Sequence, residues 1–182
     1  SAFDELFVHT NTGSAMTGMS VGDGNGDDRL DIAIVIGSLD GVGFLRGNGD
    51  RTWAASEALQ TFDAPSDVIM ADLDADGNDE IIVASLSGTD GRVAAYSRPP
   101  GQNTFTRTVL AAGSAPCVGL AVGQLDDDAL PDLAVACGTS GLIALRNPGT
   151  IAGGWTEVAL DTSAGARYST VALGDLDRDG DT

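Results

Sequence analysis

Acidic residues alternate along the stretch from Asp72 to Glu80, which reads Asp-Leu-Asp-Ala-Asp-Gly-Asn-Asp-Glu. Counted from Asp72, acidic side chains fall at positions 1, 3, 5 and 9, and a glycine stands at position 6. Five carboxylates in nine residues repel one another, and the stretch contains no Lys or Arg to offset them. Ca²⁺ binds about six to eight oxygen ligands in flexible geometry. The stretch therefore predicts a calcium site with the candidate ligands Asp72, Asp74, Asp76, Asn78 (through its backbone carbonyl) and Glu80.

The residues around this loop favour strands. An EF-hand loop has similar spacing, but it needs Glu at position 12 and helices on both sides. Position 12 is Val83, and the flanks are short apolar runs rich in β-branched residues, Val68–Met70 and Ile81–Ala84. Such runs are typical of buried strands. The sequence therefore predicts a unit of strand, acidic loop and strand.

The same acidic unit occurs three more times, and its odd positions complete the set of candidate metal ligands. These residues are Asp23, Asn25, Asp27, Arg29 and Asp31 in the first loop, Asp126, Asp128, Leu130 and Asp132 in the third, and Asp175, Asp177 and Asp179 in the fourth. Arg29 and Leu130 stand at position 7 and would contribute backbone carbonyls. Because Gln124 occupies position 1 of the third loop, that site is expected to be weaker or empty. The fourth loop stops at Thr182, before its position 9.

Three sequence markers repeat in phase. The loops begin at residues 23, 72, 124 and 175, so successive copies are 49, 52 and 51 residues apart. Aromatic residues that begin strand-like segments keep the same period, as do arginines that close short apolar runs. They are Phe3, Trp53, Phe105 and Trp155, and Arg46, Arg98 and Arg146. Core packing is the expected role of the aromatics, with sugar stacking as the alternative. The arginines are expected to cap strand ends or pair with loop acids, with contact to a ligand as the alternative. Markers in phase at one period indicate a repeat architecture.

Each period contains four strand-like runs separated by turn signals, and no segment has helical periodicity with caps. Four-stranded sheets at this period suggest an all-β fold of β-propeller blades. The chain is therefore predicted to be one propeller segment, with three full repeats at about 11–61, 62–112 and 113–161 and partial blades at 1–10 and 162–182. Strands are expected near 3–10, 16–22, 31–37, 42–46, 52–60, 66–71, 80–86, 92–97, 104–110, 117–123, 132–138, 141–146, 154–160 and 168–174.

Charge argues against several classes of function. The net charge is −18, and the four loops hold 17 of the 27 acidic residues. No basic patch is available to neutralise phosphates, so nucleic-acid binding is not expected. No apolar run is long enough to span a bilayer. His9 is the only histidine and lacks a supporting catalytic motif, so the chain is not expected to be an enzyme.

The two cysteines are too few for a disulfide scaffold. Cys117 precedes the third loop and Cys137 follows it. The composition favours two buried thiols used as small apolar residues. A disulfide remains open, because strands that pair around the loop would bring the two residues close together.

Three segments resemble the FG-GAP/VCBS repeat family of integrin-α-type propellers and bacterial secreted proteins: Val21–Asp27, Asp128–Val135 and Gly174–Gly180. The resemblance extends over essentially the whole chain. It implies four-stranded blades with the Ca²⁺ loop between the first and second strands. It also implies a closed ring of about seven blades in a full-length protein, acting in adhesion, in ligand binding or as an accessory domain.

The expected function is a non-catalytic, calcium-binding propeller segment of a secreted or cell-surface protein, for recognition or adhesion of an unidentified protein or glycan. Two alternatives stay open: an accessory domain of a secreted polysaccharide-active enzyme, and a lectin-like glycan-binding propeller. The chain is expected to be a fragment of a longer protein. Self-association that completes the ring is the alternative, because an open array exposes blade faces and sheet edges.

Overall fold

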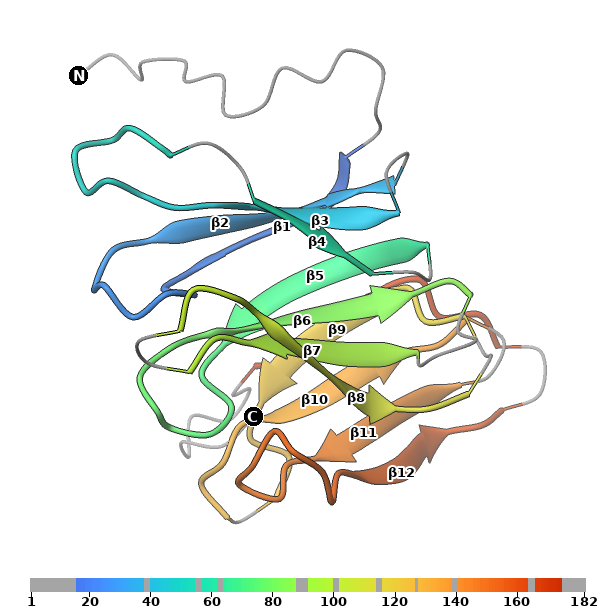
Figure 1. Cartoon of the computed structure of the whole chain (residues 1–182). Coiled ribbons are helices and arrows are strands. Elements are labelled where there is room, and N and C mark those ends of the chain that lie inside the picture. Colours follow the sequence, from blue (N-terminus) through green and yellow to red (C-terminus); the bar gives the residue numbers. More distant parts are fainter. Residues whose placement is uncertain are drawn as a thin grey trace.

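The computed structural model contains three four-stranded antiparallel sheets, stacked on one another without closing into a ring (Figure 1). No α-helix occurs in the part of the chain that it describes. The predicted all-β class and the four-stranded, blade-like sheets are thus confirmed. The described residues are 16–37, 40–54, 57–61, 64–87, 92–99, 102–113, 116–126, 128–138, 141–163 and 166–174.

Each sheet is a meander in which consecutive strands pair antiparallel. Each sheet is called a blade from here on, and the first strand of each blade is called its inner strand. The first blade contains β1 (Met16–Gly22), β2 (Asp31–Ile36), β3 (Gly41–Leu45) and β4 (Glu57–Gln60). The second contains β5 (Pro65–Ala71), β6 (Glu80–Ser85), β7 (Val93–Ser97) and β8 (Thr106–Ala111), and the third β9 (Gly119–Gly123), β10 (Asp132–Ala136), β11 (Leu142–Arg146) and β12 (Thr156–Asp161).

The middle blade shows why its strands are apolar on both faces. Side chains alternate between the two faces of a strand. In β6, Ile81 and Val83 pack toward the first blade, whereas Ile82 and Ala84 pack toward the third. All four are buried, so the run is continuously apolar. The acidic loop that connects β5 to β6 is held at the edge of this core.

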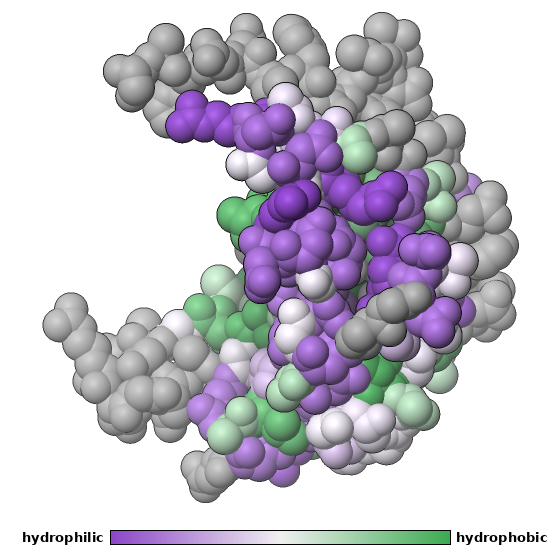
Figure 2. Space-filling view, turned by 60° about the vertical axis from the view of Figure 1, so that its left-hand side comes forward, coloured by the Kyte–Doolittle hydropathy of each residue, from purple (hydrophilic) through white to green (hydrophobic). Residues whose placement is uncertain are grey.

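Figure 2 shows hydrophilic residues over much of one side of the described surface, with hydrophobic residues reaching it in places.

Two expected strands differ from the structure. The strand expected at 52–60 begins only at Glu57, and Trp53 instead forms an isolated bridge with Gly47. A turn precedes Trp53. In this turn, Arg51 has a positive φ of 71°, which a strand cannot accommodate. The strand expected at 168–174 forms only an isolated bridge between Tyr168 and Gly138, because no described strand supplies a ladder for it. The expected strand at 3–10, with Phe3 and His9, lies outside the described residues.

The cysteines form a disulfide, so the interpretation of two free thiols is wrong. The β9–β10 hairpin places Gly119 opposite Ala136, and the amide of Val118 donates a hydrogen bond of 2.8 Å to the carbonyl of Ala136. This register brings Cys117 and Cys137 together at the end of the hairpin. Composition alone could not show it, because the bond depends on how the two strands pair.

The repeating aromatics and arginines connect neighbouring strands and blades. The aromatics Trp53, Phe105 and Trp155 are partly buried, and each packs against one of three core clusters, as expected for packing residues. Arg46 and Arg98 both contact the carboxylate of Glu57, at 3.1 Å and 2.7 Å. Because Arg98 belongs to the second blade and Glu57 to the first, this ion pair connects the two blades.

Candidate metal centre

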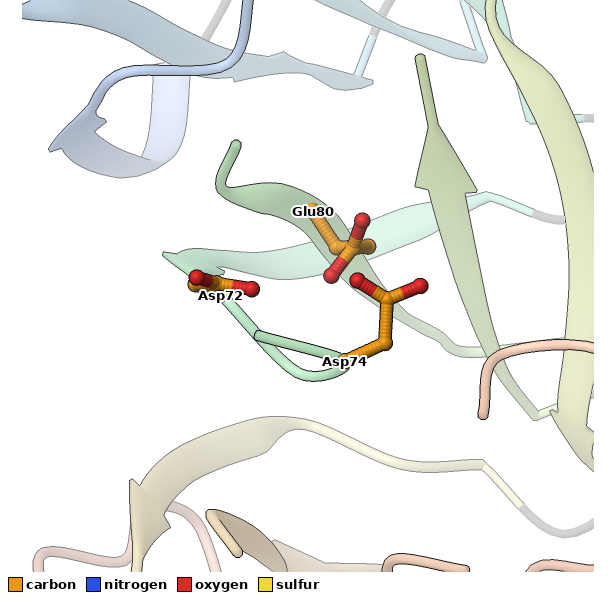
Figure 3. A group of neighbouring side chains, drawn as sticks. All are labelled: Asp72, Asp74 and Glu80. Atoms are coloured by element: carbon orange, nitrogen blue, oxygen red, sulfur yellow. The ribbon is translucent and has the colours of Figure 1, made fainter. Parts of the chain in front are cut away.

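The second acidic loop brings three carboxylates together. Ligand oxygens of Asp72, Asp74 and Glu80 lie within 4.8 Å of one another. Asp72 directly follows β5, Glu80 begins β6, and Asp74 reaches across from the loop between them (Figure 3). The loop folds back because Ala75 and Gly77 adopt left-handed backbone angles, with φ of 58° and 90°.

Glu80 is the most deeply buried member of this acidic cluster of Asp72, Asp74 and Glu80. It is 2% exposed, and one oxygen accepts a 2.9 Å hydrogen bond from the amide of Leu73. Burial, together with the smaller effect of the negative charges of Asp74, Asp76 and Asp72, raises the pKa of Glu80 to about 8. No described basic side chain forms an ion pair with the cluster. A buried carboxylate without a positive partner is unfavourable when ionised.

Asp74 contributes a buried oxygen that no described residue satisfies. Its Oδ1 atom is buried and has no hydrogen-bond partner in the described part of the chain. Burial, together with the charge of Asp76, raises the pKa of Asp74. Buried acceptors are rarely left unpaired, because the lost hydration costs about 1–3 kcal/mol. An unpaired oxygen beside two more carboxylates is the donor set that a hard divalent cation prefers, so these residues fit calcium.

The other predicted ligands of the second loop lie outside this cluster. Asp76 is exposed, and its Oδ1 accepts hydrogen bonds from the backbone and side-chain nitrogens of Asn78, at 2.8 Å and 2.9 Å. Asn78 itself is buried. The roles of Asp76 and of the Asn78 carbonyl in metal binding stay predictions.

In the first loop, the carboxylate of Asp23 is used by the loop itself. It accepts hydrogen bonds from the amides of Gly26, Asp27 and Asp28, at 2.7, 3.1 and 2.6 Å. The opposite end of the loop is held by Asp31, which is fully buried and accepts from the Asn25 side chain at 2.7 Å and from the amide of Gly47 at 2.8 Å.

The described residues of the first loop form no carboxylate cluster comparable to that of the second. Arg29, expected to offer its carbonyl, has its side chain 3.9 Å from the Asp27 carboxylate. Whether Asp23, Asn25, Asp27, Arg29 and Asp31 bind an ion stays a prediction.

The third loop has a positive partner of its own. The Nε atom of Arg146 lies 3.6 Å from an oxygen of Asp126. Asp132 is fully buried and accepts the amides of Leu125 and Asn147, at 3.0 and 2.7 Å. Asp128 accepts the amide of Leu130 at 2.9 Å. The expectation of a weaker or empty third site stays a prediction. Asp175, Asp177 and Asp179 of the fourth loop lie outside the described residues.

Sequence reasoning missed two residues that connect the loops. Asp79 accepts the amide of Asp23 at 2.8 Å and donates its own amide to the Asp23 carbonyl, also at 2.8 Å, so it joins the first two loops. Asn147 donates to the carbonyls of Leu73 at 2.6 Å and Pro131 at 3.0 Å, so it joins the second loop to the third. Asp79 is an acidic residue at an even position of the second loop, where the other acids stand at odd positions. This break in the alternation was a signal in the sequence that Asp79 has a separate role. Asn147 follows a marker arginine, but nothing in the sequence marks its role.

Replacing Asn147 by Ala is expected to lower the free energy of unfolding by about 1–2 kcal/mol, because two carbonyls at a buried position lose their donor. Denaturant unfolding followed by tryptophan fluorescence measures this. Asn48→Ala is the matched control, because Asn48 is exposed and its side chain donates to the nearby Thr52 hydroxyl at 2.8 Å, within one turn. The control should change stability by less than about 0.5 kcal/mol. If both variants lost the same free energy of unfolding, the proposed role of Asn147 in connecting the two loops would be wrong.

Comparison with known proteins agrees with this arrangement. Residues 72–135 match the family model of the FG-GAP-like repeat. The matched segment begins at the carboxylate cluster and ends in β10, so it includes the second and third acidic loops and the strands that follow them. Repeats of this family are typically non-catalytic and commonly bind Ca²⁺. No curated protein matches the chain. A four-stranded blade with the acidic loop between its first two strands, together with this match, shows that residues 72–135 carry an FG-GAP-like repeat.

Proposed function

We propose that this chain is a calcium-stabilised, non-catalytic β-propeller segment of a secreted or cell-surface protein, which serves recognition or adhesion. The observation that carries the calcium part is the cluster of Asp72, Asp74 and Glu80, with its unpaired buried oxygen on Asp74. Asp72, Asp74 and Glu80 would hold the ion. The ion would neutralise the cluster and fix the connection between β5 and β6, so that its binding energy adds to folding.

The disulfide supports the extracellular part of the proposal. Disulfides persist in oxidising environments and are rare in the cytosol of most organisms. FG-GAP repeats occur in extracellular proteins. Calcium sites of extracellular modules can be weak and still fill, since their dissociation constants are about 0.1–1 mM. No helix in the described part of the chain is long and apolar enough to cross a membrane.

Thermal unfolding with and without calcium tests the metal proposal. At 2 mM Ca²⁺, a site of this strength stabilises by about 0.6–1.8 kcal/mol. That corresponds to a rise in Tm of about 2–6 °C for a chain of this size. Asp74→Ala is expected to remove this rise, because it deletes the unpaired ligand oxygen.

Two controls separate binding from charge screening. Asp126→Ala removes the acid at the equivalent position of the third loop, which Arg146 already neutralises, and should leave the calcium response in place. Mg²⁺ at the same concentration should give a smaller rise, because it demands stricter octahedral geometry. No response to Ca²⁺, or equal responses to both ions, would contradict the proposal.

One observation favours the alternative of glycan recognition. A cavity of about 360 Å³ lies between the outer strands of the first two blades, lined by Glu57, Tyr96, Phe105 and Arg107 among others. Aromatic and charged groups together suit a sugar ring. However, Phe105 already packs against Arg98, whose guanidinium carbon lies 4.2 Å from the ring centre. Binding on a glycan array that is lost in Arg107→Ala would favour this alternative over protein recognition.

A further inference from the structure

A second cavity lies at one end of the first blade, where two connections between strands meet. Connections alternate between the two ends of an antiparallel meander, so the β1–β2 loop and the β3–β4 connection share an end (Figure 1). The cavity measures about 360 Å³, which is in the range of small-molecule sites. We call it the first-blade cavity. Its lining includes Asp28, Arg29 and Leu30 of the loop, and Arg51 and Trp53 of the connection.

Two glycines of the connection let these segments approach each other. A Cβ atom built on Gly47 would lie 2.2 Å from the carbonyl oxygen of Leu30. Gly49 has a positive φ of 76°, and a Cβ atom built there would lie 3.3 Å from the Cδ and Nε atoms of Arg29. The side chain of Arg29 therefore lies against the connection and lines the same cavity as Arg51.

In the part of the chain that the structure describes, Arg29 and Arg51 have no carboxylate at hydrogen-bond distance. An oxygen of Asp27 lies 3.9 Å from Arg29, and none of the described ion pairs includes Arg51. Asp50 accepts the amide and the hydroxyl of Thr52 instead, at 3.0 and 2.5 Å. The chain has three acidic residues for each basic one, and four other arginines do pair with a carboxylate: Arg46, Arg92, Arg98 and Arg146. The guanidinium groups of Arg29 and Arg51 are thus available to a ligand.

Trp53 gives the cavity an aromatic wall. It packs against the apolar cluster of β2 and β3, which leaves it partly buried, and the rest of its surface lines the cavity. Leu30 adds an apolar side chain that is 65% exposed. Asp28 adds an exposed carboxylate, which accepts hydrogen bonds when it is ionised. The cavity thus combines donors for an acid, an acceptor for hydroxyl groups and an aromatic wall for a ring.

We propose that the first-blade cavity binds one acidic sugar, a hydroxylated ring with a single carboxylate, at the end of an otherwise neutral glycan. Arg29 and Arg51 bind the carboxylate, Trp53 packs on the ring, and Asp28 accepts its hydroxyl groups. An acidic peptide would use the two arginines, but Asp28 would only repel it. The net charge of −18 disfavours a long polyanion. The inference deepens the recognition part of the proposed function and rests on it, but it does not rest on the calcium part.

Titration with glucuronate tests this proposal, followed by calorimetry and by tryptophan fluorescence in about 2 mM Ca²⁺. We expect a dissociation constant on the order of 1 mM, and binding of neutral glucose that is weaker by about tenfold or more. Arg29→Gln and Arg51→Asn should each weaken glucuronate binding by about tenfold or more, because each removes one guanidinium group. Both positions are exposed, and Asn tolerates the left-handed backbone of Arg51, so the Tm of both variants should stay unchanged.

Arg167→Gln is the matched control. It removes the same charge at an exposed position outside the cavity lining, so this variant should bind glucuronate like the unmodified chain. Equal loss of binding in Arg167→Gln would show a general effect of charge and would overturn the proposal. No binding at about 20 mM glucuronate also overturns it, as does equal binding of glucose or acetate. An acidic peptide that binds as tightly as glucuronate would overturn the choice of a sugar.

Two further outcomes would place the ligand elsewhere and overturn the proposal. If Arg107→Ala lost binding and Arg51→Asn kept it, the sugar would lie in the cavity between the first two blades. If chelator abolished binding and Arg51→Asn kept it in calcium, the carboxylate would lie on a bound calcium ion. The rise in Tm with Ca²⁺ is measured on the same unmodified chain without sugar, so failure of this inference and failure of the calcium proposal are distinguishable.

Discussion

Replacing Glu80 by Gln is expected to stabilise the protein in chelator at pH 8 and to abolish its stabilisation by calcium. The neutral amide removes a buried charge, and its carbonyl oxygen can still accept the amide of Leu73. In the absence of calcium, the variant should therefore gain on the order of 2–4 kcal/mol in the free energy of unfolding. Adding calcium should not raise the stability of this variant further, because the variant lacks one carboxylate of the cluster.

The pH dependence has a definite sign. The pKa of Glu80 is raised from 4.5 to about 8 by burial, so between these values the folded chain holds a proton that the unfolded chain has released. Stability from this group is complete below pH 4.5 and is lost as pH rises toward 8. Glu80→Gln should flatten this decline in chelator. In the unmodified chain, the gain from calcium should grow over the same range, because the ion competes with the proton for the carboxylate.

Denaturant unfolding at pH 5 and pH 8, in chelator and in 2 mM Ca²⁺, measures both effects. Glu57→Gln is the control, because Glu57 pairs with Arg46 and Arg98 and is not a member of the acidic cluster. That variant should lose stability at pH 8 while keeping the calcium response of the unmodified chain. If Glu80→Gln were destabilised in chelator and still responded to calcium, Glu80 would be a structural hydrogen-bond acceptor and not a ligand.

Most of the fold could be predicted because local pattern and tertiary environment agree. The run Ile81–Ala84 is apolar throughout, and the structure buries it between two blades. The acidic loops interrupt such runs, so their places between the first and second strands were also predictable. The bounds of the outer strands were harder to predict from the sequence. Trp53 looked like the start of a strand, but a turn at Arg51 delays β4 to Glu57.

The candidate site shows a different limit. Spacing gives the type of each residue in a loop but not the direction of its oxygens. Asp23 and Asp72 both stand at position 1, and both accept amides of their own loop, yet Asp72 also lies in a group of three carboxylates. Contacts between blades also join these loops, such as that of Asp79 with the backbone of Asp23. Such contacts join residues 56 positions apart, and a pattern within one loop cannot show them.

Replacing Phe44 by Ala is expected to lower the free energy of unfolding by about 3–5 kcal/mol, the cost of a large cavity in a packed core. Phe44 is fully buried between the first two blades and meets the ring of Phe105 edge to face at 5.1 Å. The guanidinium carbon of Arg98 lies 5.6 Å from the Phe44 ring centre. A Cβ atom added to Gly24 of the first loop would lie only 2.9 Å from this ring. Phe44 therefore packs directly under that loop and supports it. Ordinary domains are stable by about 5–15 kcal/mol, so this one change removes a large fraction.

Urea unfolding measures this loss, and Phe44→Leu should recover more than half of it, because Leu fills most of the cavity. Leu86→Ala is the control: Leu86 is 47% exposed, and its truncation should cost less than about 1 kcal/mol. A cost below about 1 kcal/mol for Phe44→Ala would mean that the first blade does not pack on the second in solution. That packing also sets the contact of Asp79 with the first loop. Phe44→Ala should therefore increase hydrogen exchange in residues 23–31 more than in residues 124–132, and equal increases would place the weakened contact elsewhere.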